Sequence, residues 1–348
     1  MSKRPKRILV LYDLPEPVAE HADPRYLLDH DDRPTEKDVC RAIKKLGLEL
    51  FVHGVFDEAV ALWQRLAEIK PDVVFNLCET FRGDRSHEGD IASILELANV
   101  PYTGSQPAAL HLCKDKGATK KIVGWDGVRV PAFKVYSKDE FQFERFEATF
   151  PLIVKPLNRE ASEGIAKASI VDSWDACRER ASWVAHKLQS DVIVEEYIHG
   201  RELYVGVISS GGITKALPPR ELFFDKLDKE EPMVATYKAK WDNKYRARWG
   251  ISTGRVGPLP EAVLQRLKEE SVRVFCSLGL DGYARMDWRL NSAGELVFLE
   301  ANPNPALSQD DDFALAAKSA DISYGELIAR LIESALLSEK IKSRASGS

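Results

Sequence analysis

The chain has 348 residues, of which 44% are hydrophobic and 30% are charged, as is typical of a soluble globular protein with two or three domains. Its net charge of -5 provides no basic surface for a polyanion, which argues against nucleic-acid binding. The five cysteines include no Cys-x-x-Cys pair, so we expect neither a disulfide framework nor a zinc site, and a reducing, cytoplasmic compartment is favoured. No apolar run is long enough to span a membrane, so no membrane association is expected.

The N-terminal third alternates between strand-like and helix-like patterns. Residues 8–12 predict a first β-strand, because their short apolar run is too small for the core of a signal peptide. Further strands are predicted at 48–53 and 73–75, and helices at 36–46, 58–69 and 91–98. Alternation with short links predicts a mostly parallel sheet with helices on both faces. We take residues 1–105 as the first domain.

Two further α/β domains are predicted, at residues 106–198 and 199–340, followed by a disordered polar tail at 341–348. The central domain combines helices at 114–121 and 174–188 with strands at 150–156 and 192–198. The C-terminal domain combines helices at 262–278 and 324–337 with strands at 203–209, 282–290 and 296–301.

A predicted hairpin near the C-terminus is the segment most informative about chemistry. Turn-forming residues at 291–294 separate two strand-like segments, so these segments are expected to pair. Side chains alternate between the two faces of a strand, which places Arg285 and Asp287 on one face of the first strand. By the same rule, Glu300 and Asn302 share one face of the second strand.

The pairing of these strands would bring the four polar groups together. If Leu290 pairs with Glu295 across the turn, Arg285 falls opposite Glu300. Carboxylate and amide oxygens are ligands that suit Mg²⁺, and an arginine beside them suits an anionic transition state. The alternative is a surface strand with alternating polar residues. The apolar run at 296–299 argues against it, because a charge in a buried strand needs a partner.

Lysines and acids near other predicted strands add to this pattern. Lys155 ends an apolar strand and Lys116 lies in a basic stretch, so either ammonium group could hold a phosphate. Glu195 and Glu202 flank a strand end, where acids can accept hydrogen bonds from an adenine amine or a ribose. Taken singly, each lysine is better interpreted as a solvated surface residue, and for each acid a surface position is at least as good an interpretation. The chain has no GxxxxGK[ST] loop and no GxGxxG motif, so it supports neither a P-loop hydrolase nor a Rossmann dehydrogenase.

Six segments, taken in order and with their spacing, resemble the ATP-grasp superfamily and, within it, the D-alanine–D-alanine ligase-like family. They are residues 99–105, 115–120, 151–156, 194–202, 282–287 and 299–303. The resemblance extends over residues 76–337. It implies an α/β ATP-grasp fold of three α/β domains, with ATP between the central and C-terminal domains, and a homodimer formed through the N-terminal domain.

The resemblance also implies roles for individual residues. The residues implied to bind ATP are Lys116, Lys155, Ser162, Glu195, Glu196, Ile198 and Glu202. Those implied to bind two Mg²⁺ ions, for which Mn²⁺ could substitute, are Asp287, Glu300 and Asn302. Arg285 matches the arginine that stabilises the tetrahedral intermediate, and Lys240 matches a lysine on a mobile loop that reaches the γ-phosphate. Residues 159–164 resemble the lid over the triphosphate.

Departures from the family pattern concern the substrates. The N-terminal glycine- and serine-rich segment with a catalytic glutamate is missing, and Asp13 or Glu16 is the candidate replacement. Candidate substrate contacts are Glu79, His87, Glu88 and Asp311. Acids at 310–312 follow the hairpin where the family has a serine that binds a carboxylate. We therefore hypothesise that one of them binds an amine-bearing part of the substrate; the alternative is a solvated acidic loop.

The implied function is an ATP-dependent ligase that joins a small-molecule carboxylate, activated as an acyl phosphate, to an amine, with amino acids as the expected substrates. One alternative is an amino-acid or dipeptide ligase of a secondary pathway whose substrates are not D-alanine. A second, of another class, is a catalytically inactive ATP-binding module with a regulatory role. A third is a kinase that phosphorylates a small molecule on the same scaffold.

Overall fold

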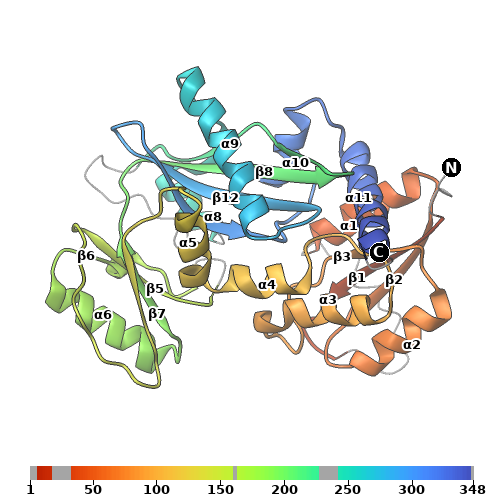
Figure 1. Cartoon of the computed structure of the whole chain (residues 1–348), viewed down its shortest axis with the longest axis horizontal. Coiled ribbons are helices and arrows are strands. Elements are labelled where there is room, and N and C mark those ends of the chain that lie inside the picture. The colour runs from red at the N-terminus through yellow and green to blue at the C-terminus, as the bar shows by residue number, and fades with distance from the viewer. Residues whose placement is uncertain (1–5, 18–32, 160–162, 227–241, 346–348) are drawn as a thin grey trace.

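The computed structural model describes residues 6–17, 33–159, 163–226 and 242–345. In these ranges the strands form three sheets, which follow one another along the chain (Figure 1). Ser162 and Lys240, for which ATP-related roles are expected, lie outside the described residues.

The N-terminal sheet is parallel, with the order β2-β1-β3. Its strands are β1 (Arg7–Asp13), β2 (Glu49–Val55) and β3 (Val73–Asn76). Ile8 and Val10 face α1 (Pro34–Lys45) and α11 (Tyr324–Ala345) in one core, whereas Leu9 and Leu11 face α2 (Ala59–Ile69) and α3 (Glu88–Leu97) in another. The expected parallel sheet with both faces covered is confirmed.

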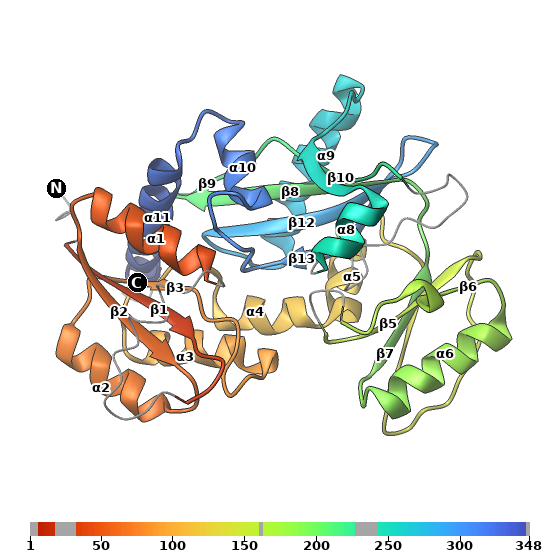
Figure 2. The same ribbon diagram turned by 180° about the vertical axis from the view of Figure 1, so that it is seen from behind.

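Helix α11 differs from the helix expected at 324–337. It reaches Ala345, so residues 341–345 of the expected disordered tail are helical. Leu327, Ile328 and Leu331 are buried in the core of the N-terminal sheet. The last helix of the chain therefore covers the first sheet, as both views show (Figures 1 and 2).

The second sheet is antiparallel, with the order β4-β7-β5-β6, and α6 (Trp174–Lys187) covers one face. Its strands are β4 (Phe133–Tyr136), β5 (Leu152–Pro156), β6 (Ile170–Val171) and β7 (Val192–Glu196). Ser173 begins α6 by accepting a hydrogen bond from the Ala176 amide at 3.3 Å. Short 3₁₀ turns, η2 (Arg85–His87) and η3 (Lys167–Ser169), lie in the connections.

The third sheet has six antiparallel strands along the path β11-β10-β8-β12-β13, with β9 also paired to β8. They are β8 (Arg201–Ser210), β9 (Ile213–Ala216), β10 (Arg220–Phe224), β11 (Ile251–Arg255), β12 (Tyr283–Leu290) and β13 (Leu296–Asn302). The apolar core on one face includes residues of α4 (Pro107–Lys114), α5 (Lys116–Trp125) and α9 (Glu261–Ser277). Helices α4 and α5 thus pack on the third sheet, although the sequence assigned them to the central domain. The described residues also include the helices α8 (Asn243–Trp249) and α10 (Asp312–Lys318).

The five cysteines are free thiols, and four of them are buried. Burial raises the pKa of Cys40 and of Cys177 to about 12, so these thiols stay protonated at neutral pH. Within the described ranges, no helix combines the length and the apolar character needed to cross a membrane.

His53 on β2 provides a pH-dependent test of the N-terminal sheet. Burial, reinforced by the charge of Arg65, lowers its pKa from 6.5 to about 4. As the pH falls from 6.5 towards 4, His53 becomes protonated in the unfolded chain but stays neutral in the folded chain. Acidification therefore stabilises the unfolded state and lowers the free energy of unfolding. We expect wild type to lose about 1–2 kcal/mol more than His53→Gln between pH 7 and pH 5, measured by urea denaturation. His186→Gln, at an exposed site, is the control; an equal loss in wild type and His53→Gln would contradict the prediction.

Candidate active site

The β12–β13 hairpin has a register that the sequence did not predict. Leu290 pairs with Leu296 rather than with Glu295, and Trp288 pairs with Phe298. The register then shifts, so that Asp287 pairs with Glu300 and Arg285 with Asn302, which leaves Leu299 as the extra residue of a β-bulge. The expected pair of Arg285 with Glu300 is therefore wrong. Because paired residues share a face, the four polar side chains nevertheless lie on one face of the sheet.

Arg285 and Asp287 are bound to each other on this face. The guanidinium donates two hydrogen bonds to the carboxylate, Nε to Oδ1 at 2.7 Å and Nη2 to Oδ2 at 2.9 Å. Burial would lower the pKa of Arg285, but the charge of Asp287 outweighs it and the pKa is raised. The arginine also stacks over the Tyr204 ring, with 4.8 Å to the centroid. Arg285 is therefore a fixed positive charge beside the candidate metal ligands.

Lys116 reaches the same region from the first turn of α5. The Asp115 carboxylate begins this helix by accepting from the amides of Gly117 and Ala118 at 2.8 and 2.9 Å. The Lys116 ammonium donates to the Arg159 carbonyl at 2.6 Å and lies 3.9 Å from Glu300 Oε2. Lys116 is 5% exposed, so the surface interpretation of this lysine is wrong.

Glu195 on β7 is surrounded by two lysines. Its side chain is 1% exposed, Oε1 accepts a hydrogen bond from Lys155, and Oε2 lies 3.1 Å from the Lys120 ammonium. Burial favours the protonated acid, but the charges of Lys120 and Lys155 outweigh burial and hold the pKa of Glu195 below its usual value. Glu195 is therefore an ionised acceptor, and the surface interpretation is wrong here too.

The segment after β7 crosses from the second sheet to the third. Glu196 accepts hydrogen bonds from the amides of Thr149 at 2.8 Å and Ala132 at 3.3 Å, and Ile198 is partly buried. Gly200 has φ +142, and a Cβ there would lie 2.1 Å from the Leu290 carbonyl oxygen. Only glycine lets the chain pass so close to the end of β12.

Glu202 lies on the same sheet face as Asp287. On β8 it pairs with Arg289, which is two residues after Asp287 on β12 and therefore points to the same face. Its carboxylate accepts from Arg289 at 2.6 Å and from the Tyr204 hydroxyl at 2.8 Å. These contacts orient the side chain, and each carboxylate oxygen keeps a further lone pair for a ligand.

A pocket of about 270 Å³ opens where β1 and β3 end against the segment after β13. Asp13 lies in its wall and accepts from the Thr80 hydroxyl at 2.7 Å, while Arg33 donates to Glu36 at 2.9 Å. Glu79, a candidate substrate contact, also lines it. The pocket thus presents both signs of charge next to Asn304, which follows the candidate metal ligands in the sequence.

The other three candidate substrate contacts do not line this pocket. Glu88 is buried in an ion pair with Lys114 at 2.7 Å. His87 is exposed and bonded to Asp90 at 2.7 Å. Asp311 accepts from the hydroxyl and amide of Ser308 at 2.6 and 3.0 Å. Each of these side chains is engaged by a neighbour within the chain.

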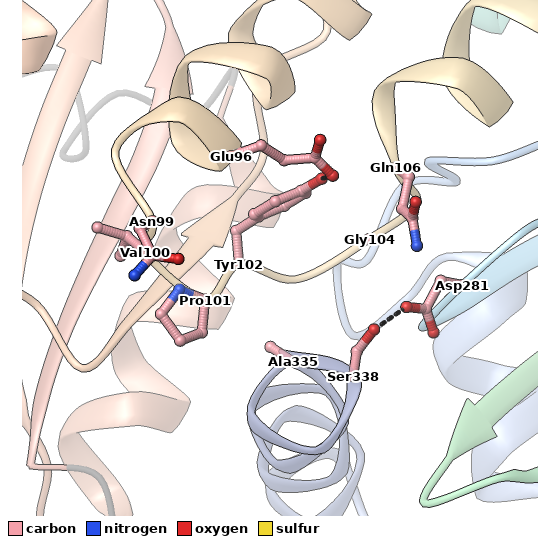
Figure 3. Close-up of a pocket in the computed structure, with 10 residues that line it drawn as sticks. All are labelled: Glu96, Asn99, Val100, Pro101, Tyr102, Gly104, Gln106, Asp281, Ala335 and Ser338. Carbon is pink, nitrogen blue, oxygen red and sulfur yellow. Dashed lines mark hydrogen bonds between the residues drawn. The ribbon is translucent and has the colours of Figure 1, made fainter. Parts of the chain in front are cut away.

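A second pocket, of about 460 Å³, lies between the end of α3, the loop after it and α11 (Figure 3). None of the predicted site residues lines it. Its two carboxylates are already engaged, Glu96 with the Tyr102 hydroxyl at 3.0 Å and Asp281 with Ser338. It is therefore separate from the polar sheet face.

The polar face of the third sheet offers ligands that fit a hard cation. Among the described residues, no three His, Cys, Asp or Glu side chains gather into a metal-binding set. The candidate set instead has two carboxylates, Asp287 and Glu300, and the amide oxygen of Asn302. Oxygen donors of these kinds suit Mg²⁺. Asp287 would share its oxygens between Arg285 and the ion.

Lys120 is the residue that sequence reasoning missed. It was part of the 115–120 segment of the resemblance but was given no role. Lys116 and Lys120 are four residues apart on α5, and this spacing places two side chains on one face of a helix. That spacing was the signal that could have identified it.

Comparison with known proteins identifies the family of the chain. Residues 116–333 match the family described as D-ala D-ala ligase C-terminus. The D-alanine–D-alanine ligase of Aquifex aeolicus is 30% identical over 298 residues, covering 86% of this chain and 93% of that protein. The enzyme of Bordetella petrii is 30% identical over 302 residues, with 86% of both chains covered. An uncharacterized protein of Sinorhizobium fredii is also 30% identical, over 261 residues.

A solved D-alanine–D-alanine ligase from Bacillus anthracis, complexed with ATP, shares the fold. The TM-score is 0.72 at 21% identity, with 97% of this chain and 99% of that chain covered. The protein is thus an ATP-dependent carbon–nitrogen ligase with the ATP-grasp fold. Within that class, the chain belongs to the D-alanine–D-alanine ligase family.

Proposed function

We propose that this chain joins two amino acids, or amino-acid-like molecules, with ATP as the source of energy and an acyl phosphate as the intermediate. The observation that carries the proposal is the grouping of Arg285, Asp287, Glu300 and Asn302 on one sheet face, with Lys116 beside Glu300. Such a face combines oxygen ligands for a cation with positive charges for phosphates.

The nucleotide would lie between the second and third sheets. Lys116 and Lys155 are assigned to its phosphates, Glu195, Glu196 and the Ile198 backbone to its adenine, and Glu202 to its ribose. The support for this assignment is that Lys155 forms an ion pair with Glu195 and that Lys116 lies 3.9 Å from Glu300. Glu202 lies on the same sheet face as Asp287. Ser162 and Lys240 keep the roles implied by the resemblance, and both lie outside the described residues.

Asp287, Glu300 and Asn302 would hold Mg²⁺, two ions in our proposal, with Mn²⁺ as a substitute. Bound there, the metal would supply positive charge against the triphosphate. Arg285 adds a fixed positive charge where the acyl phosphate forms and the amine attacks it. Catalysis would rest mainly on positioning and electrostatics, since an acyl phosphate is intrinsically reactive.

The substrates would occupy the pocket bounded by Asp13, Arg33 and Glu79. Here Asp13 replaces the glutamate missing from the N-terminal segment, because it lies at the end of β1 and lines the pocket. The mixture of acidic and basic side chains fits a substrate with an ammonium and a carboxylate group. Among the acids at 310–312, Asp312 is paired with Arg220 at 2.6 Å and Asp310 is exposed. The departures from the family pattern favour a substrate pair other than two D-alanines.

The test is a screen of ADP and phosphate release over pairs of L- and D-amino acids and small acids, with the products read by mass spectrometry. The proposal expects ADP release for at least one pair, with a product whose mass is the sum of the two substrates less one water. ATP binding without ADP release for any pair would indicate an inactive module. A stable phosphorylated product would indicate a kinase.

A further inference from the structure

Lys120 occupies an unusual position for a lysine. It lies on α5, one helical turn after Lys116, and only 1% of its surface is exposed. A buried ammonium is costly unless it is hydrogen-bonded and paired with a charge. The partners of Lys120 therefore indicate what the side chain does.

These partners belong to two different sheets. The ammonium donates to the carbonyl oxygen of Leu299 at 2.6 Å, on β13 of the third sheet. It also lies 3.1 Å from Glu195 Oε2, on β7 of the second sheet. One side chain thus links the strand assigned to adenine recognition with the strand assigned to metal binding.

The Leu299 carbonyl differs from the other carbonyls of β13 because Leu299 is the extra residue of the bulge. A bulge leaves its extra residue outside the regular ladder, so a side-chain donor can fix its conformation. If the register set by Leu290 and Leu296 continued without a bulge, Asp287 would pair with Leu299, and Glu300 would point to the opposite face. The bulge therefore decides whether Glu300 and Asn302 face Asp287 and Arg285.

Glu195 is fixed by the same contact. Lys155 binds one carboxylate oxygen and Lys120 lies against the other, so the carboxylate has one orientation. Losing Lys120 would free one oxygen of Glu195 and the carbonyl of Leu299 together. One consequence would affect the strand assigned to the adenine and the other the strand assigned to the metal.

We propose that Lys120 is a positioning residue that holds the Leu299 bulge and the Glu195 carboxylate in place, and so couples metal binding to nucleotide binding. This inference rests on the proposed ATP and Mg²⁺ site. Lys120 would act through Glu300, Asn302 and Glu195, because its ammonium contacts the Leu299 carbonyl and Glu195, and we assign it no direct role in holding the nucleotide or the metal.

The experiment compares Lys120→Met, which keeps the length of the side chain but removes its charge and donors, with Lys121→Met at the exposed neighbouring position. Binding of a non-hydrolysable ATP analogue is measured by calorimetry at increasing Mg²⁺ concentration, and circular dichroism checks folding. We expect Lys120→Met to raise the Mg²⁺ concentration for half-maximal binding at least about tenfold, as supporting partners of metal ligands do. Lys121→Met should leave that concentration unchanged. A folded Lys120→Met that matches Lys121→Met within twofold would overturn the inference.

Two further variants decide the matter if Lys120→Met does not fold. Lys120→Arg keeps the charge for Glu195, whereas Lys120→Gln keeps a donor without a charge. The inference expects the arginine variant to need about tenfold less Mg²⁺ than the glutamine variant; equal requirements would refute it. If wild type itself fails to bind the analogue with Mg²⁺, the proposed function fails first, so the two failures are distinguishable.

Discussion

Replacing Glu300 by glutamine is expected to lower the rate of ADP release by about 10²–10³-fold. Glu300 pairs with Asp287 across the hairpin and lies 3.9 Å from the Lys116 ammonium. Glutamine keeps the size and one carbonyl oxygen but removes the negative charge, so it would hold a divalent cation much more weakly. Turnover is measured by ADP release with a substrate pair found in the screen, over a range of Mg²⁺ concentrations.

Glu295→Gln is the matched control for this variant. Glu295 immediately precedes β13 at the hairpin turn, is exposed, and forms an ion pair with the surface residue Arg129. An exposed ion pair of this kind contributes little to stability, so turnover should stay near that of wild type. If Glu300→Gln also turns over ATP at the wild-type rate with an unchanged Mg²⁺ requirement, Glu300 is not a metal ligand.

Replacing Arg285 by lysine is expected to lower kcat by about 10²–10³-fold while the KM for ATP changes less than about threefold. The guanidinium binds Asp287 through two parallel hydrogen bonds, and lysine cannot reproduce this fork. Lysine keeps the positive charge beside Asp287, so the buried carboxylate is not left unpaired and the fold should persist. The loss should therefore fall on the transition state, where negative charge develops.

Arg273→Lys, at an exposed position on α9, is the control for the general effect of this substitution. Steady-state kinetics give kcat and KM, and thermal unfolding confirms that both variants are folded. A rise in KM with an unchanged kcat would show that Arg285 serves ground-state binding instead.

Local sequence pattern was sufficient for most helices and strands. The short apolar run of residues 8–12 and the alternation of strand-like and helix-like segments predicted a parallel N-terminal sheet covered on both faces, and this is confirmed. The turn formers at 291–294 predicted the hairpin. In the structure the Asn291 side chain accepts from the amides of Ala293 and Glu295, at 3.0 and 2.9 Å, which explains why these residues turn the chain.

Contacts between distant parts of the chain were beyond the reach of local pattern. Nothing near α11 indicates that it covers the first sheet, and nothing near α5 indicates that it packs against the third. Pattern also could not distinguish Lys116 and Glu195 from surface residues. Their burial depends on partners that are tens of residues or more away, such as Arg159, Glu300, Lys120 and Lys155.

By itself, the sequence determined that Arg285 and Asp287 share one face of their strand and that Glu300 and Asn302 share one face of the next strand. It also determined that the ordered segments resemble one ligase family. These conclusions follow from a two-residue period and from residue order, both of which are local. The sequence also predicted that the two pairs share one face, but only the tertiary structure decided the register by which they do so. The turn sets a register that would place the two pairs on opposite faces. The bulge at Leu299, which Lys120 of α5 contacts, shifts the register by one residue and places both pairs on the same face. A register shift of one residue moves every side chain of a strand to the opposite face. The contact at this bulge joins Lys120 to Leu299, 179 positions apart in the chain, so local sequence pattern could not predict it.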